Sequence, residues 1–146
     1  MIFARVFLLV LPLYPLQGLA EIYEVSTTAE LREALVSAAK NGEDDTVRLM
    51  DGVYKTSDDS GGTFYYLGEE SHSLTLSGSN RDKVILSGSM NDQILSHNSP
   101  TENSDLILEN ISFINGSSDS GAGAVDSIFN IFVRHCYFEN NSGLSG

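Results

Sequence analysis

Two stretches near the end of the chain decide its fold: LILENISFIN at residues 106–115 and IFVRHCYFEN at residues 131–140. Superposed at an offset of 25 residues, they match at apolar and polar positions alike. The matched pairs are Leu106 with Ile131, Leu108 with Val133, Ile111 with Cys136, Phe113 with Phe138, Asn115 with Asn140, and Ser117 with Ser142. A match that keeps its register through the loop as well as the strands indicates a structural repeat, and a period in the twenties indicates a solenoid.

The spacing of the large apolar residues within one repeat predicts two short strands joined by a corner. These residues are Leu106, Leu108, Ile111 and Phe113. Steps of two are the period of a strand with one face inward, whereas the single step of three needs one more residue at a corner. Asn110 tolerates the left-handed conformation of such a corner, and a second corner follows at residues 115–116 and 140–141. We therefore predict an all-β fold, a parallel β-helix whose coils hydrogen-bond about 4.8 Å apart.

Residues 21–45 are predicted to form an N-terminal cap with an amphipathic helix at about residues 28–41. Thr27 and Glu30 form a capping box, and Gly42 follows as a C-terminal stop. The apolar stripe of this helix is Leu31, Ala34, Leu35, Ala38 and Ala39. Because the first coil of a solenoid exposes core residues and unpaired backbone, we expect the stripe to cover that coil. The alternative is a helix that binds a partner.

Residues 46–146 are predicted to form the β-helix coils. Runs that read as strands occur before the duplicated segment at residues 46–50, 53–54, 64–67, 74–78 and 84–88. Residues 56–62 and 96–104 are polar and are predicted to be loops. Leu86 and Leu108 are 22 residues apart, near the later period, so roughly four coils are expected. The chain stops in the middle of a coil, which predicts an open C-terminal end and a fragment.

Residues 1–20 have the features of a secretory signal peptide. Arg5 precedes an apolar run at residues 6–16, and Gly18 and Ala20 place small residues where signal peptidase cleaves. We predict cleavage after Ala20, with a membrane anchor as the alternative. The rest of the chain has no second apolar stretch of spanning length. The expected location is therefore secreted, or at a cell surface or outer membrane, with no transmembrane segment in the mature chain.

The net charge of the chain restricts the classes of partner that it can bind. Without Arg5, seven Lys and Arg face 20 Asp and Glu, a formal charge of −13. This balance excludes nucleic acid and anionic lipid, which need cationic contacts. The acidity serves solubility, and calcium is the alternative. The acidic clusters are Glu43-Asp44-Asp45, Asp58-Asp59 and Glu69-Glu70, and none has the alternating spacing of a calcium loop, so no cofactor is assigned.

The cysteine and the histidines do not form a recognisable reactive site. Cys136 is the only cysteine, and its match with Ile111 predicts an inward, core-filling thiol, not a nucleophile. His72, His97 and His135 are scattered, and two of them are predicted to lie in polar loops. A metal site needs at least three convergent ligands, so none is predicted.

Several motifs carry a resemblance to a known family. Those of the first part are Glu30-Leu31-x-x-Ala34-Leu35, Asp45-Thr46-Val47-x-Leu49 and Gly52-x-Tyr54. Together they resemble the opening of the bacterial right-handed parallel β-helix proteins of the pectin-lyase-like superfamily. Residues 138–141 (FENN) and 123–125 (GAV) resemble the FxxN and GGAI elements of polymorphic outer-membrane proteins and adhesins. The pattern is incomplete, because Gly116 stands in place of an Asn and Ala122 in place of a Gly.

The resemblance implies a right-handed solenoid and two classes of function. One is an adhesin-like passenger, a scaffold without catalysis that presents loops to a glycan or a host cell surface. The other is the N-terminal part of a polysaccharide lyase or glycoside hydrolase. Such enzymes use carboxylates on an exposed strand face, either with calcium and a basic residue or as a pair of acids.

The outward strand positions favour binding over catalysis. These positions are Ser112, Ile114, Phe132, Arg134 and Tyr137. They do not place two carboxylates and a basic residue on one face. Glu109 and Arg134 occupy equivalent corners and predict an ion pair between coils. Tyr65 or Tyr66, together with Tyr137, are candidates for stacking on sugar rings. We assign no catalytic, cofactor-binding or metal residue, and a truncated product without independent function is a further alternative.

Overall fold

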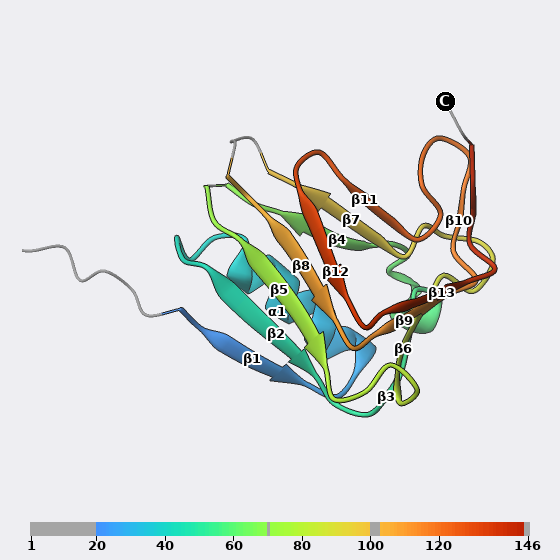
Figure 1. Cartoon of the computed structure of the whole chain (residues 1–146), viewed down its shortest axis with the longest axis horizontal. Coiled ribbons are helices and arrows are strands. Elements are labelled where there is room, and N and C mark those ends of the chain that lie inside the picture. The colour runs from blue at the N-terminus through green and yellow to red at the C-terminus, as the bar shows by residue number, and fades with distance from the viewer. Residues whose placement is uncertain (1–19, 70, 100–102, 145–146) are drawn as a thin grey trace, which may run out of the picture.

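The chain winds into a parallel β-solenoid capped by a helix at its N-terminal end (Figure 1). The computed structural model describes residues 20–69, 71–99 and 103–144. The described chain makes three complete turns and starts a fourth, slightly fewer than the roughly four coils expected. The turns stack on one another, so that their strands form three parallel sheets along the solenoid. The predicted signal peptide, except for Ala20, lies outside the described residues.

Each full turn contributes one strand to each sheet. Sheet A contains β1 (Ile22–Val25), β2 (Asp45–Leu49), β5 (Leu74–Gly78), β8 (Leu106–Glu109) and β12 (Ile131–Arg134). Sheet B contains β3 (Gly52–Lys55), β6 (Val84–Ser87), β9 (Ser112–Ile114) and β13 (Tyr137–Glu139). Sheet C contains β4 (Phe64–Leu67), β7 (Leu95–Asn98) and β11 (Val125–Ser127). The short strands β10 (Ser117–Ser118) and β14 (Ser142–Gly143) pair beside them, and a 3₁₀ turn, η1, covers Asp58–Ser60.

The register between the last two turns is the one that the duplicated sequence predicts. Leu106 pairs with Ile131, and Ser117 pairs with Ser142, so this turn contains 25 residues. The earlier turns are longer because their loops are longer: Asp45 pairs with Leu74, and Leu74 with Leu106. The predicted correspondence of Leu86 with Leu108 is therefore wrong.

The two residues lie in different sheets. Leu86 pairs with Phe113 in sheet B, and Leu108 pairs with Leu76 in sheet A. Loops of unequal length between the strands allow one spacing to fit two different pairings, and only the structure distinguishes them.

The corners adopt the left-handed conformation that was predicted from their asparagines. Asn110 and the equivalent His135 have φ angles of 57° and 52°, and Asn115 and the equivalent Asn140 have 55° and 51°. Because these angles recur at the same place in successive turns, the corners bend the chain in the same way and keep the strands stacked.

Close packing at the second corner explains the glycines there. A Cβ atom on Gly116 would collide with the carbonyl oxygen of Gly123, and one on Gly123 would collide with that of Ser142. In the next turn Asn141 follows Asn140, and its amide spans the coils. Gly116 N donates to Asn141 Oδ1 at 2.7 Å, and Asn141 Nδ2 donates to the Phe113 carbonyl at 2.8 Å.

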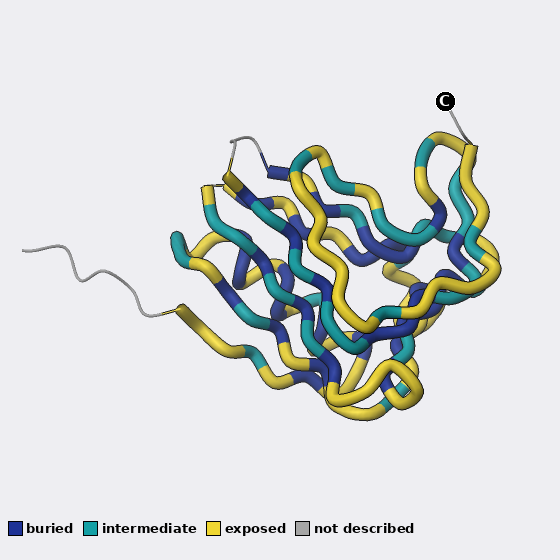
Figure 2. Tube along the Cα trace, in the orientation of Figure 1, coloured by how far each residue is buried: buried dark blue, intermediate teal, exposed yellow. Residues whose placement is uncertain are grey.

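Inward side chains of the three sheets form one continuous apolar core. Figure 2 marks the buried residues along the chain in dark blue. Alternate residues of β2, β5 and β8, such as Val47, Leu76 and Leu108, are fully buried. Phe113 stacks on Phe138 of the next turn with ring centroids 5.1 Å apart. Cys136 packs against this core as predicted, and burial raises the pKa of its thiol, which keeps the sulfur protonated.

The helix α1 (Thr28–Ala38) covers the first turn, as its apolar stripe predicts. The capping box forms, since Thr27 accepts a hydrogen bond from Glu30 N and the Glu30 carboxylate accepts one from Thr27 N. Leu31 and Leu35 are fully buried against the core. The helix ends at Ala38, before the predicted residue 41, because Lys40 N turns back to the carbonyl of Ser37 in a tighter turn.

The opposite end of the described solenoid is open, as predicted. Leu108 and Phe113 are completely buried, whereas the equivalent Val133 and Phe138 of the last turn are 48% and 44% exposed. Figure 2 shows this exposure along β12 and β13. No further turn of the described residues lies over these inward-facing side chains.

Candidate functional site

Among the described residues, sheet A has the most strands of any sheet of the solenoid. We define the sheet A face as the outward residues of four adjacent strands: Thr46, Arg48, Thr75, Ser77, Ile107, Glu109, Phe132 and Arg134. Parallel pairing places them in two straight rows that run across the coils. One row changes from hydroxyl-bearing Thr46 and Thr75 to apolar Ile107 and Phe132.

The second row of the sheet A face is charged. Arg48 donates to Glu24 of β1 at 2.9 Å, and Arg134 donates to Glu109 at 2.8 Å. The second contact confirms the ion pair predicted between equivalent corners. Both pairs are exposed, so each contributes at most about 1 kcal/mol to stability. Their alternation along the row nevertheless presents a surface that can donate to and accept from a polar ligand.

A hydrogen-bonded corner joins sheet A to sheet B beside this face. Ser79 donates a short hydrogen bond to Asp51, and Lys83 lies 3.2 Å from the same carboxylate. These hydrogen bonds, first from Ser79 and then from Lys83, lower the pKa of Asp51. A hollow of about 190 Å³ lies along this corner and is lined by Arg48, Met50, Ser77 and Ser79 among others.

The same corner continues into a second hollow of about 380 Å³. Its lining residues, which define the corner hollow, are Ser79, Asn80, Arg81, Asn110 and His135. All five are polar, and they come from three successive turns of the solenoid. The sequence predicted Asn110 and His135 as corner residues, and His135 as no metal ligand, and it did not single out Arg81. No spacing in the sequence indicates that residues 79–81 lie beside them.

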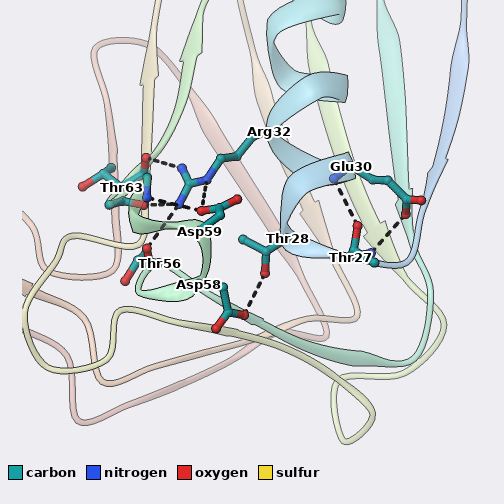
Figure 3. A network of polar contacts seen from close by, with 10 residues as sticks. Thr27, Thr28, Glu30, Arg32, Thr56, Asp58, Asp59 and Thr63 are labelled. Atoms are coloured by element: carbon teal, nitrogen blue, oxygen red, sulfur yellow. Dashed lines mark hydrogen bonds and ion pairs between the residues drawn. The ribbon is translucent and has the colours of Figure 1, made fainter.

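The acidic pair Asp58-Asp59 anchors the helix cap (Figure 3). Thr28 donates to Asp58 at 3.1 Å, and Arg32 pairs with Asp59 at 3.1 Å. Arg32 also donates to the carbonyl oxygens of Thr56, Gly62 and Thr63. Its guanidinium lies 4.6 Å from the ring centre of Phe64. Both carboxylates therefore have a structural role: they hold α1 against the loop at residues 56–63.

Two carboxylates of the acidic cluster at residues 43–45 also have structural hydrogen-bond partners. Asp45 is only 3% exposed, and its carboxylate accepts from Glu21 N and Asn41 Nδ2 at 3.1 and 3.0 Å. Burial raises the pKa of Asp45. Asp44 accepts from Ser73 N at 2.7 Å. The third cluster includes residue 70, which lies outside the described residues. Within the described residues, no group of three or more His, Cys, Asp or Glu side chains converges as metal ligands would.

His97 belongs to the core, which corrects its prediction as a loop residue. It lies in β7, is 1% exposed, and stacks on Tyr66 with ring centroids 5.0 Å apart. Its Nδ1 lies 2.9 Å from Ser127 Oγ. Burial lowers the pKa of His97 to about 4. The sequence of β7 was predicted as a loop because serine and asparagine flank His97. The strand nevertheless alternates, with His97 at an inward position.

The predicted sugar-stacking tyrosines do not share a surface. Tyr65 is 53% exposed on sheet C, Tyr137 is exposed on sheet B in the last turn, and Tyr66 is buried. Ser112, predicted to point outward, is also buried, and its hydroxyl donates to the Arg81 carbonyl at 2.7 Å. The aromatic residue that does lie on the sheet A face is Phe132, 46% exposed.

Comparisons with other proteins give no information about the site. The chain has no significant match among protein-family models, curated proteins or solved structures. Across the part of the chain that the structure describes, α1 and the other helical segments are too short or too polar to cross a bilayer.

Proposed function

We propose that this protein is a secreted or surface-displayed β-helix scaffold that binds glycans or cell-surface ligands without catalysis. In this proposal it is an adhesin-like member of the pectin-lyase-like superfamily, exported by a signal peptide cleaved after Ala20. The observation that carries the proposal is the sheet A face, where two straight rows of outward side chains cross four strands in register. An extended ligand can contact equivalent positions on successive coils of such a face.

The chemistry of the face fits a carbohydrate chain. Thr46, Thr75 and Ser77 offer hydroxyl groups, and the two arginine–carboxylate pairs offer donors and acceptors. Phe132 provides an exposed aromatic ring at the end of the apolar row, where a sugar ring can stack. Two hollows, of about 190 and 380 Å³, lie along the adjoining corner, where a polymer can continue past the face.

Binding to an immobilised panel of neutral and acidic oligosaccharides tests this proposal. The mature chain, its variant Phe132→Ser and the matched control Tyr65→Ser are compared; both variants replace an exposed aromatic residue, on sheet A and sheet C respectively. We expect Phe132→Ser to weaken binding by about three- to tenfold through loss of stacking, and Tyr65→Ser to leave it unchanged. Equal loss in both variants, or release of new chain ends from a polysaccharide by the wild-type protein, contradicts the proposal.

A further inference from the structure

We propose that the corner hollow binds an oxyanion, a carboxylate or sulfate group, of an acidic glycan. The inference rests on the proposed function for the glycan, and on the lining residues for the anion. Arg81 supplies a cationic guanidinium, His135 supplies ring nitrogens, and Asn80 and Asn110 supply amides. Within the described residues, Arg81 forms no ion pair, although the chain has a formal charge of −12.

The carboxylates that border the corner already have their own cations. Asp51 pairs with Lys83 at 3.2 Å, and Glu109 pairs with Arg134 at 2.8 Å. Asp82 is exposed on the same loop, but it does not line the hollow. A guanidinium group favours an oxyanion with two oxygens that accept parallel hydrogen bonds, as a carboxylate and a sulfate both can. An incoming carboxylate or sulfate therefore finds in Arg81 a partner that no carboxylate of the described chain occupies.

The backbone around the hollow is held in place before any ligand binds. Lys83 N and Val84 N both donate to the Asn80 carbonyl at 3.0 Å, and Ser112 Oγ fastens the Arg81 carbonyl to β9. Asn80 Oδ1 accepts from Asp82 N at 2.9 Å, which fixes that side chain and leaves its amide nitrogen as the available donor. A preorganised loop loses little conformational entropy when a ligand binds.

Titration with three hexasaccharides tests the inference: a sulfated heparin fragment, an oligogalacturonate that carries only carboxylates, and a neutral glucose oligomer. The mature wild-type chain is compared with Arg81→Gln, with His135→Asn, and with Lys55→Gln as a control. Lys55→Gln removes an exposed charge from sheet B. Asn suits residue 135 because Asn110 holds the equivalent left-handed corner.

We expect Arg81→Gln to weaken binding of the acidic probes about tenfold, and Lys55→Gln to change it less than twofold. For His135→Asn we expect a loss of about threefold. Loss with only one acidic probe identifies the anion as sulfate or carboxylate. If Arg81→Gln binds acidic probes as wild type does, or if wild type prefers the neutral probe, the inference is overturned.

A second titration separates this inference from the proposed function. Amide chemical shifts are followed while sodium sulfate is added to wild type and Arg81→Gln at constant ionic strength. Shifts at residues 79–83 that Arg81→Gln abolishes support the anion site even where no glycan binds, an outcome that removes only the proposed function. Glycan binding that depends on Phe132 but not on Arg81, without sulfate shifts, preserves the proposed function and overturns the anion site.

Discussion

At the scale of single residues, Asn141 shows how one side chain holds two coils together. Its amide accepts from Gly116 N and donates to the Phe113 carbonyl of the preceding turn. We expect Asn141→Ala to lower the free energy of unfolding by about 2 kcal/mol, because two hydrogen bonds are lost and Gly116 N is left without its acceptor. Urea denaturation measures this change. Asn98→Ala, at an exposed strand end, is the control, and an equal effect of the two substitutions would count against the bridging role.

The buried imidazole of His97 predicts a dependence of stability on pH. Burial lowers its pKa from 6.5 to about 4, against a smaller opposing effect of Asp105, so the unfolded chain binds a proton more readily than the folded chain. Stability due to His97 is therefore complete above pH 6.5 and is lost as the pH falls toward 4. The expected slope approaches about 1.4 kcal/mol per pH unit within this window.

Urea denaturation of wild type and His97→Gln across pH 4 to 7 isolates this effect. The two proteins differ by one titrating group, so the difference between their unfolding free energies cancels the contribution of the many carboxylates. We expect this difference to change between pH 6.5 and 4 and to be constant above pH 6.5. A difference that is the same at every pH would mean that His97 does not stay neutral in the fold.

At the scale of elements, the cap depends on the inner face of α1. Leu35 is fully buried against the first turn, whereas the adjacent Val36 is 54% exposed. We expect Leu35→Ala to destabilise the protein by about 2–5 kcal/mol through the cavity it leaves, and Val36→Ala by less than about 0.5 kcal/mol. Thermal or urea unfolding measures both. Similar values for the two variants would show that α1 does not close the end of the solenoid.

Elements were predictable from the sequence where repeats had the same length. Residues 106–115 and 131–140 share their register through the corner asparagines, so their pairing followed from the sequence. In the earlier turns, loops of different length separate the strands, and the spacing of Leu86 and Leu108 led to a wrong pairing. The strand Leu95–Asn98 was missed because Leu95 is its only apolar residue and its second inward residue is a histidine.

The candidate site was less predictable than the elements, since it depends on which turns lie side by side. The ion pair of Glu109 and Arg134 could be predicted because both residues occupy the same position of a clear repeat. Arg81 lies in a loop without a counterpart in that repeat, and it meets His135 at the corner hollow only through the stacking of three turns. Loop positions of this kind carry no periodic signal in a single sequence.

At the scale of the whole molecule, the two ends of the solenoid differ in what they expose. Leu108 is buried, but the equivalent Val133 is 48% exposed in the last described turn. In a polypeptide of residues 21–146, we expect Leu108→Ser to destabilise the fold by about 2–5 kcal/mol, and Val133→Ser to cost less than about 1 kcal/mol. Val133→Ser should also reduce self-association, measured by light scattering, because exposed apolar strand edges favour it. Equal destabilisation by both substitutions would contradict an open end.

The proposed function requires that ligands bind along the sheet A face and its adjoining corner. Mapping amide chemical shifts of the mature chain as an acidic hexasaccharide is added tests it most directly, because every described strand reports at once. We predict perturbations confined to β2, β5, β8, β12 and residues 79–83, with sheet C unchanged. Perturbations centred on β4 and β7 around Tyr65, or none at saturating ligand for any oligosaccharide that binds, would contradict the claim.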